Sequence, residues 1–293
     1  YINTHRFRSL AELNMTGSAG QKRVPTTFFN EIKLVVPPLK EQERIADILS
    51  TVDSQIDDTD KLIEKTKELK KGLMQRLLTK GIRHTEFKKT EVGEIPVEWK
   101  VGNNFINIFS GFGFKLNEYV DNGIPLVRIN NVTHGKILDE DWCYLPNSYK
   151  DLYKEYMLKK GDILLALNRP ITRGELKICV VNMKSSILYQ RVGKLVMDEE
   201  RYYPKFFYYY MQSNLFMKKL EAGLVGTDQP YIKNSEFKEM KFVIPSLNEQ
   251  KQIVDILSSV DTRIEEYENK KMKLEELKRG LMQKLLTGKI RVN

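Results

Sequence analysis

Cations and amides recur in the predicted loops of residues 101–244, and their side chains suit contacts with nucleic acid. Arg128 is followed by Asn130 and Asn131, and these residue types can read guanine or adenine edges through paired hydrogen bonds. We expect several such residues to touch DNA, with the cations more often on phosphates than on bases. The candidate DNA-contacting residues are Lys115, Arg128, Asn130, Asn131, Asn168, Arg169, Arg173, Lys177, Gln190, Arg191, Gln229, Tyr231 and Lys233.

Three other groups of residues resemble functional sites of different chemistry. Asp162, Glu175 and Lys177 provide the carboxylates and lysine of a metal-dependent nuclease, and this alternative stays open. Phe109–Gly113 is similar to a methyl-donor loop, but the chain has no Asn-Pro-Pro-aromatic motif, so we expect no methyltransferase chemistry. Phe206–Tyr210 could stack bases, although its helical spacing favours a place in the core. We therefore predict no catalytic residue and no metal site.

Composition limits the classes of protein to which the chain can belong. Its 293 residues suggest about two domains, and a net charge of +9 makes a polyanion a plausible partner. The chain has no signal peptide and no apolar run of membrane-spanning length, which argues against a membrane partner. The two cysteines, Cys143 and Cys179, form no disulfide framework and favour a cytoplasmic location. Because the chain begins at Tyr1 without a Met, we expect a segment to precede it.

The elements that must position these residues are organised around one stretch that occurs twice. The first copy begins at Pro37–Gln42 and ends at Gly72–Thr79, whereas the second begins at Pro245–Gln250 and ends at Gly280–Thr287. The offset is 208 residues at both ends, since 249 − 41 = 208 and 287 − 79 = 208. A period of this length is too long for a solenoid. It indicates two copies of one module, each a long helix that follows a globular part.

Apolar residues in both copies alternate in steps of four and three, which is the heptad pattern of a coiled coil. The first half of each helix is acidic and the second half is basic, so opposite charges face one another only in an antiparallel pair. We expect Asn248 to cap the start of the second helix, and Gly81 and Gly288 to end the two helices. The predicted seam residues are Ile45, Leu49, Val52, Ile56, Ile63, Ile253, Leu257, Val260, Ile264 and Leu274.

The predicted fold class is α+β, with a globular mixed α/β domain and two long helices that form an antiparallel coiled coil. Strands are expected at 31–36, 124–129, 162–166, 178–181 and 193–197. Helices are expected at 146–154 and 204–222. Trp99 is expected to anchor the connector at 82–100 to the next domain.

The repeated motifs resemble the conserved regions of the specificity subunit of type I restriction–modification systems. The resemblance rests on the Pro-x-Leu-x-Glu-Gln opening and the Gly-Leu-Met-Gln-x-Leu-Leu-Thr ending of both helices. Gly93–Trp99 is similar to that family's leader into a target-recognition domain. Lys160–Leu164 and Gln190–Gly193 are similar to motifs that recur inside such domains.

The resemblance implies a non-catalytic, sequence-specific DNA-binding subunit that recognises part of a bipartite site in double-stranded DNA. It implies methyltransferase (modification) subunits docked through the coiled-coil spacer, and restriction/translocase subunits as indirect partners. The methyl donor is expected on the partner subunit, so no cofactor is expected on this chain. An alternative that stays open is a truncated half-subunit that oligomerises to rebuild a two-domain reader.

The same resemblance implies four segments. Residues 1–39 are expected to be the C-terminal remnant of a first target-recognition domain, and residues 40–82 the central conserved long helix. Residues 83–247 are expected to form a second target-recognition domain, and residues 248–293 the distal conserved long helix.

Overall fold

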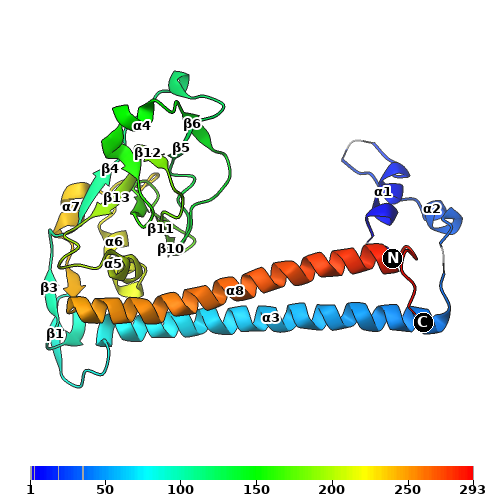
Figure 1. Ribbon diagram of the computed structural model, residues 1–293, viewed down its shortest axis with the longest axis horizontal. Coiled ribbons are helices and arrows are strands. Elements are labelled where there is room, and N and C mark those ends of the chain that lie inside the picture. The colour runs from blue at the N-terminus through cyan, green and yellow to red at the C-terminus, as the bar shows by residue number, and fades with distance from the viewer. Residues whose placement is uncertain (1, 3, 19, 35, 293) are drawn as a thin grey trace. The chain divides into compact units, whose positions relative to one another are not determined.

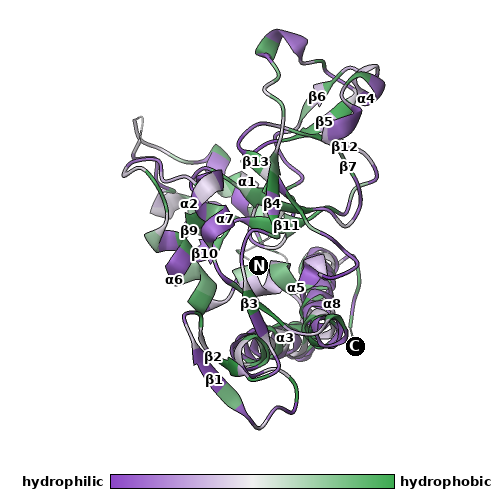
Figure 2. Ribbon diagram, turned by 90° about the vertical axis from the view of Figure 1, so that its left-hand side faces the viewer, coloured by the Kyte–Doolittle hydropathy of each residue, from purple (hydrophilic) through white to green (hydrophobic). Residues whose placement is uncertain are grey.

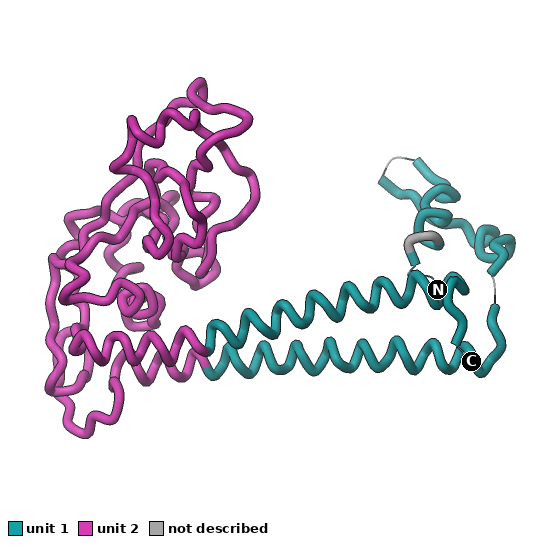
Figure 3. Tube along the Cα trace, viewed as in Figure 1, with its two compact units in different colours: residues 1–69, 260–293 teal, residues 70–259 magenta. Residues whose placement is uncertain are grey.

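The computed structural model describes residues 2, 4–18, 20–34 and 36–292, and the chain divides into two compact units (Figure 3). Unit 1 comprises residues 1–69 and 260–293, and unit 2 comprises residues 70–259. Two long helices, α3 (Leu39–Lys80) and α8 (Leu247–Leu285), contribute to both units (Figure 1). Among the described residues, no helix combines the length and the apolar character that a membrane span requires.

Residues of the repeated stretch determine where the long helices begin and end. The carbonyl of Pro38 accepts the N–H of Glu41 at 2.9 Å, and α3 stops before Gly81, whose φ of 64° is left-handed. At the start of α8, the hydroxyl of Ser246 accepts the N–H of Glu249 at 3.2 Å. The prediction that Asn248 caps this helix is wrong, because the helix already begins at Leu247 and Ser246 takes the capping position.

Within unit 1, α3 and α8 run antiparallel, as predicted. Three ion pairs join the two helices. Their α3 members are spaced seven residues apart, and the residue numbers of their α8 partners decrease in the same order. These pairs are Asp53 with Lys278, Asp60 with Lys271 at 2.7 Å, and Lys67 with Glu268 at 3.3 Å. Acidic residues near the start of α3 therefore meet basic residues near the end of α8.

The seam between the two helices is apolar with polar interruptions. In unit 1 the side chains of Ile45, Val52 and Ile63 are buried, and in unit 2 those of Ile253 and Leu257 are fully buried. The other predicted seam residues are half-buried, namely Leu49, Ile56, Val260, Ile264 and Leu274. Thr59 also lies buried at a heptad position, which the apolar pattern missed, and its hydroxyl donates to the Gln55 carbonyl at 2.7 Å.

The segment before α3 contains two short helices, α1 (His5–Leu13) and α2 (Thr26–Glu31). The strand predicted at 31–36 is wrong: Glu31 ends α2, residues 32–34 form no strand, and Val35 lies outside the described residues. The corresponding stretch of unit 2 does form a strand, β14 (Phe242–Ile244), because β3 (Lys100–Gly102) pairs with it. Among the described residues of unit 1 no strand offers this pairing.

Unit 2 contains two four-stranded sheets in its described residues. The first is antiparallel, in the order β11 (Ile178–Val180), β8 (Ile163–Ala166), β13 (Val192–Val196) and β4 (Asn107–Ser110). The second is mixed, in the order β6 (Cys143–Leu145), β5 (Ile124–Val127), β12 (Ser186–Leu188) and β7 (Met157–Leu158). Strands of these sheets such as β8 are rich in hydrophobic residues, whereas the two long helices, seen end-on in Figure 2, carry both hydrophobic and hydrophilic residues.

Smaller elements complete unit 2. Two hairpins pair β1 (Phe87–Thr90) with β2 (Gly93–Pro96) and β9 (Ile171–Thr172) with β10 (Glu175–Leu176). The α-helices are α4 (Tyr149–Leu152), α5 (Pro204–Met211), α6 (Asn214–Ala222) and α7 (Asn234–Glu239). Short 3-10 helices lie at Leu116–Glu118 and Lys154–Tyr156.

The remaining predicted elements of unit 2 lie close to observed ones. The four predicted strands correspond to β5, β8, β11 and β13, and the first helix shortens to α4 and a 3-10 turn. The helix predicted at 204–222 is two helices, because the hydroxyl of Ser213 accepts the N–H of Phe216 at 3.3 Å and starts a new helix there. The aromatic side chains of Phe206–Tyr210 are buried, which confirms their place in the core.

Candidate nucleic-acid interface

Four loops of unit 2 meet at one edge of the two larger sheets. They follow β5 and β8, precede β13, and cross the segment before α7. Backbone hydrogen bonds join them: Leu167 donates to Arg191 at 2.9 Å, and Arg169 donates to Pro230 at 2.7 Å. The ends of buried strands thus place residues that are far apart in sequence side by side.

A pocket of about 300 Å³ opens among these loops. Four predicted DNA-contacting residues, two cations and two amides, are among those that line it. The lining residues are Arg128, Ile129, Asn130, Tyr189, Gln190 and Arg191. The sequence reasoning missed Tyr189, whose hydroxyl accepts a hydrogen bond from the Gln190 amide at 3.3 Å. A concave site with convergent donors and acceptors suits one polar edge of a ligand.

Arg128 is held on one side only. One terminal nitrogen of its guanidinium donates to the Asp141 carbonyl at 2.5 Å. Its Nε is buried and has no hydrogen-bond partner among the described residues. A buried donor without a partner carries a cost in free energy.

The Asn131 side chain is buried and stabilises the loop through hydrogen bonds to its backbone. Its side chain is 1% exposed, its Oδ1 accepts the N–H of Arg128 at 3.0 Å, and its amide donates to the Glu140 carbonyl at 3.0 Å. This burial disfavours the predicted contact between Asn131 and DNA. Asn130, by contrast, is exposed.

Two arginines of the cluster and one of the adjoining β9–β10 hairpin adopt left-handed backbone conformations. The φ angles are 45° at Arg169, 54° at Arg173 and 68° at Arg191, and all three residues are exposed. Such conformations are uncommon for residues other than glycine and are kept where the surroundings enforce them, often at functional sites. Loop-to-loop backbone hydrogen bonds supply that enforcement at Arg169 and Arg191. Arg173 and Gly174, with φ angles of 54° and 77°, form the two-residue turn of the β9–β10 hairpin, which requires such conformations.

The other candidates lie around this cluster. Asn168 and Tyr231 pair across a β-bridge, and Lys233 lies 3.3 Å from the Glu236 carboxylate. Gln229 is exposed beside this bridge. Lys115 follows a loop that reaches the pocket, since the N–H of Gln190 donates to the Phe112 carbonyl at 3.0 Å. Lys177 points inward, and its ammonium donates to the Ile129 carbonyl at 3.1 Å.

The residues of the nuclease alternative do not form one site. Asp162 and Lys177 lie at opposite ends of β8: the Asp162 carboxylate accepts the N–H of Lys159 at 2.8 Å, whereas the Lys177 carbonyl accepts the N–H of Ala166 at 3.0 Å. Four strand residues separate these ends by about 13 Å. Within the described ranges, no group of three His, Cys, Asp or Glu side chains could hold a metal ion.

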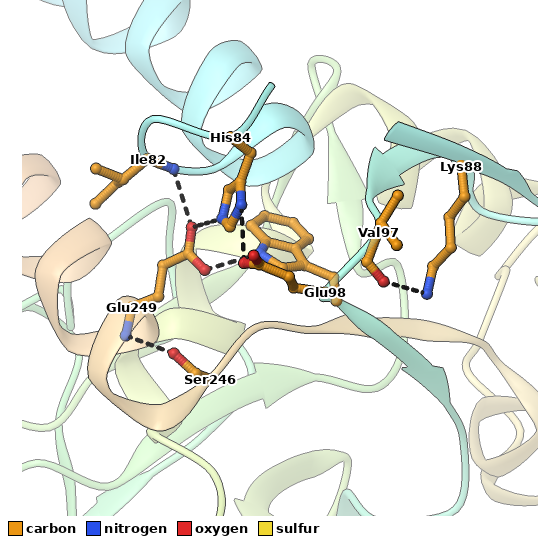
Figure 4. A network of polar contacts seen from close by, with 8 residues as sticks. Ile82, His84, Lys88, Val97, Glu98, Ser246 and Glu249 are labelled. Carbon is orange, nitrogen blue, oxygen red and sulfur yellow. Dashed lines mark hydrogen bonds and ion pairs between the residues drawn. The ribbon is translucent and has the colours of Figure 1, made fainter. Parts of the chain in front are cut away.

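A second polar network ties α8 to the chain that follows α3 (Figure 4). One oxygen of Glu249 accepts the N–H of Ile82 at 2.9 Å and lies 2.9 Å from Nε2 of His84. Its other oxygen accepts the indole N–H of Trp99 at 2.8 Å, and Nδ1 of His84 lies 3.1 Å from the Glu98 carboxylate. Trp99 is therefore the anchor that the sequence predicted, and its partner is the opening motif of α8.

Comparisons with known proteins agree with the sequence motifs. A family model described as the type I restriction modification DNA specificity domain matches residues 4–68 and 96–276. The chain is 42% identical over 284 residues to the type I restriction enzyme MjaVIII specificity subunit of Methanocaldococcus jannaschii, covering 95% of this chain and 67% of that protein. It is 24% identical over 332 residues to the EcoAI specificity subunit of Escherichia coli, covering 85% of this chain and 56% of that protein.

Solved structures share the fold. One, from work on complex assembly and conformational transition of the type I R-M system, matches with a TM-score of 0.58 and 16% identity over 95% of this chain and 67% of that chain. The type I restriction-modification S subunit of M. genitalium matches with a TM-score of 0.53 and 18% identity over 94% of this chain and 68% of that chain.

Proposed function

Because the chain belongs to the family of type I restriction–modification DNA specificity domains, we propose that it is the sequence-specific DNA-binding subunit of such a complex. It recognises part of a bipartite site and is non-catalytic, since its relatives are specificity subunits. Methyltransferase subunits dock on the coiled-coil spacer and carry the methyl donor, whereas restriction and translocase subunits are indirect partners. The complex acts on double-stranded DNA in the cytoplasm, without a cofactor on this chain.

The observation that carries this proposal is the loop cluster of unit 2. It combines exposed cations, which suit phosphates, with amides and an arginine around a pocket, which suit base edges. Its arginines Arg169 and Arg191 hold unusual backbone conformations. We propose that residues 83–247 form a target-recognition domain that reads DNA through this cluster.

We also propose that residues 1–39 are the C-terminal remnant of a first recognition domain of the same fold, and that residues 40–82 and 248–293 are the conserved helices. The helices of unit 1 repeat those of unit 2. Helix α1 matches α6 at an offset of 209 residues, since 214 − 5 = 209, and α2 matches α7 at 208, since 234 − 26 = 208. Even the capping agrees, because Thr4 accepts the N–H of Phe7 and Ser213 accepts that of Phe216, each at 3.3 Å.

The connections between these helices agree as well. Each pair is joined through a loop that closes with an antiparallel bridge, namely Thr16 with Arg23 in unit 1 and Val225 with Tyr231 in unit 2. Exposure differs, however. Phe237 is 1% exposed in the core of unit 2, whereas its counterpart Phe29 is 55% exposed. This uncovered face supports the assignment of residues 1–39 to the last part of a recognition domain.

A half-subunit that must oligomerise to rebuild the reader is not favoured. In unit 1, the seam of α3 faces α8 of the same chain, and three ion pairs span the two helices. In unit 2, Ile253 and Leu257 are buried in one core with Leu77. The helices therefore meet each other without a second copy.

Exchange of Arg128 and Asn130 for alanine tests the proposal. The double variant, in complex with its modification subunits, is expected to lose discrimination at one position of the site by about tenfold or more, because paired hydrogen bonds to that base edge are removed. The measurement is sequencing of duplexes retained from a randomised library. Lys150→Ala, an exposed lysine of α4, is the control. Unchanged preference together with normal partner docking would remove both residues as readers.

A further inference from the structure

Lys177 differs from the exposed cations of the loop cluster in where its charge is directed. Its ammonium group donates a hydrogen bond of 3.1 Å to the carbonyl of Ile129. The side chain is half-buried, and this burial lowers the pKa of the ammonium group from its ordinary value. Arg169 and Arg173, by contrast, are exposed. The charge of Lys177 therefore faces the protein rather than solvent.

The carbonyl that Lys177 holds lies at the centre of the proposed reading turn. Ile129 stands between Arg128 and Asn130, and all three line the pocket. Fixing the peptide group after Ile129 restricts the backbone angles on either side of it, and with them the directions of both neighbouring side chains. Asn131 holds the same turn from its other end, since its Oδ1 accepts the N–H of Arg128.

Lys177 is itself firmly attached to the sheet. Its backbone N–H donates to the Pro170 carbonyl at 2.7 Å, and its carbonyl accepts the N–H of Ala166, the last residue of β8, at 3.0 Å. The turn is thereby joined to a buried strand through a hydrogen bond from a charged donor, which is stronger than one between neutral groups.

We propose that Lys177 is a positioning residue for base recognition: it fixes the turn that carries Arg128 and Asn130, and it does not contact phosphate. The inference rests on the proposed function, because the turn reads bases only if the chain binds DNA. It replaces the role that the sequence suggested, in which Lys177 contacts DNA directly. The two roles differ in their dependence on salt.

The salt dependence of binding to a randomised duplex library separates the roles. The slope of log K against log salt concentration is negative, and loss of one phosphate contact reduces its magnitude by about 0.9. Lys177→Met, in complex with the modification subunits, is expected to keep the wild-type slope while discrimination at one base falls by about tenfold. Arg173→Gln removes an exposed cation of the adjoining β9–β10 hairpin and is expected to reduce the magnitude of the slope. Lys160→Met, at the far end of β8, is expected to change neither quantity.

Hydrogen exchange in the absence of DNA tests the attachment itself. The N–H groups of Arg128 and Asn131 are both hydrogen-bonded within the turn. In Lys177→Met, their exchange is expected to become faster by about tenfold, and Lys177→Arg, which keeps a cationic donor, is expected to restore part of the protection. If Lys177→Met does not fold, Lys177→Arg alone is compared with wild type. An intermediate loss of protection from exchange is expected, and the absence of any loss would overturn the inference.

Two results overturn the proposal. One is a slope whose magnitude is reduced as in Arg173→Gln with base preference unchanged, which identifies a phosphate contact. The other is unchanged exchange in the turn, which removes the attachment whether or not DNA binds. Failure of the wild-type complex to bind any duplex would instead refute the proposed function, and the exchange experiment would still decide the role of Lys177 in the turn.

Discussion

The helix-start motif is the same in α3 and α8, but it works in two chemical settings. In unit 2, Glu249 accepts N–H groups from the Ile82 backbone and the Trp99 indole, and it contacts His84. Its side chain is 11% exposed, and Trp99 belongs to the main apolar core. This contact depends on buried, directional hydrogen bonds.

In unit 1, Glu41 occupies the same position of α3, and its contact is ionic. Both of its oxygens accept hydrogen bonds of 2.6 Å from the Arg291 guanidinium, and Val292 N–H adds one of 3.4 Å. Hydrogen bonds from Arg291 lower the pKa of the Glu41 carboxyl below its ordinary value. The Glu41 side chain is only 7% exposed, but the Arg291 side chain is 61% exposed, so water and salt reach this pair from the arginine side.

The difference shows what the repeated motif supplies and what it leaves open. In both units it places a carboxylate in the first turn of a long helix, where it receives the chain that follows the opposite helix. The residues that arrive there decide the character of the contact. An indole and an imidazole make it part of a core, whereas a guanidinium makes it an ion pair between a buried carboxylate and an exposed cation.

The largest effect is expected from a charge placed in the seam near the Glu249 end. Leu257 is fully buried in unit 2, whereas Ile264 is half-buried in unit 1. Leu257→Asp is expected to lower the free energy of unfolding by about 5 kcal/mol, because it removes apolar contacts and buries a carboxylate. Ile264→Asp is expected to cost about 2 kcal/mol. Urea unfolding followed by circular dichroism measures both, and equal losses would contradict the difference in burial.

The next effect comes from the carboxylates themselves. Glu249→Ala leaves the donors of Ile82 and Trp99 without an acceptor in a buried place, so the free energy of unfolding is expected to fall by about 3 kcal/mol. Glu249→Gln keeps one acceptor oxygen and is expected to recover part of this loss. Glu41→Ala is expected to cost less, because Arg291 regains water. A larger loss for Glu41→Ala would reverse the comparison.

The smallest effect concerns acid and salt. Because the pKa of Glu41 is lowered in the folded protein, the ion pair with Arg291 stabilises the fold above the ordinary pKa of 4.5, and this stabilisation is lost as pH falls through the lowered value. The difference in urea midpoint between wild type and Arg291→Gln should therefore shrink to zero in acid, and shrink in high salt at neutral pH. Lys289→Gln, an exposed neighbour, serves as the control. A difference that persists in acid would show that Arg291 acts through packing rather than charge.

The amino-acid sequence alone predicted much of the candidate site, because its residues are of types that bind DNA. Arg128, Asn130, Gln190 and Arg191 were predicted from their side-chain chemistry, and they line one pocket. Residue type did not distinguish the residues that line the pocket from buried neighbours. Asn131 has the same side chain as Asn130, but the turn buries one and exposes the other, because only one of them faces the carbonyls of residues 138 and 140.

Heptad spacing and the reversal of charge along each helix determined, from the sequence alone, that two long helices pair antiparallel. Both signals are local and periodic, so no other part of the chain is needed to interpret them. Only the tertiary structure decided the direction of Lys177 and the partners of Glu41 and Glu249. These depend on residues brought together from distant parts of the chain, and sequence spacing does not specify such contacts.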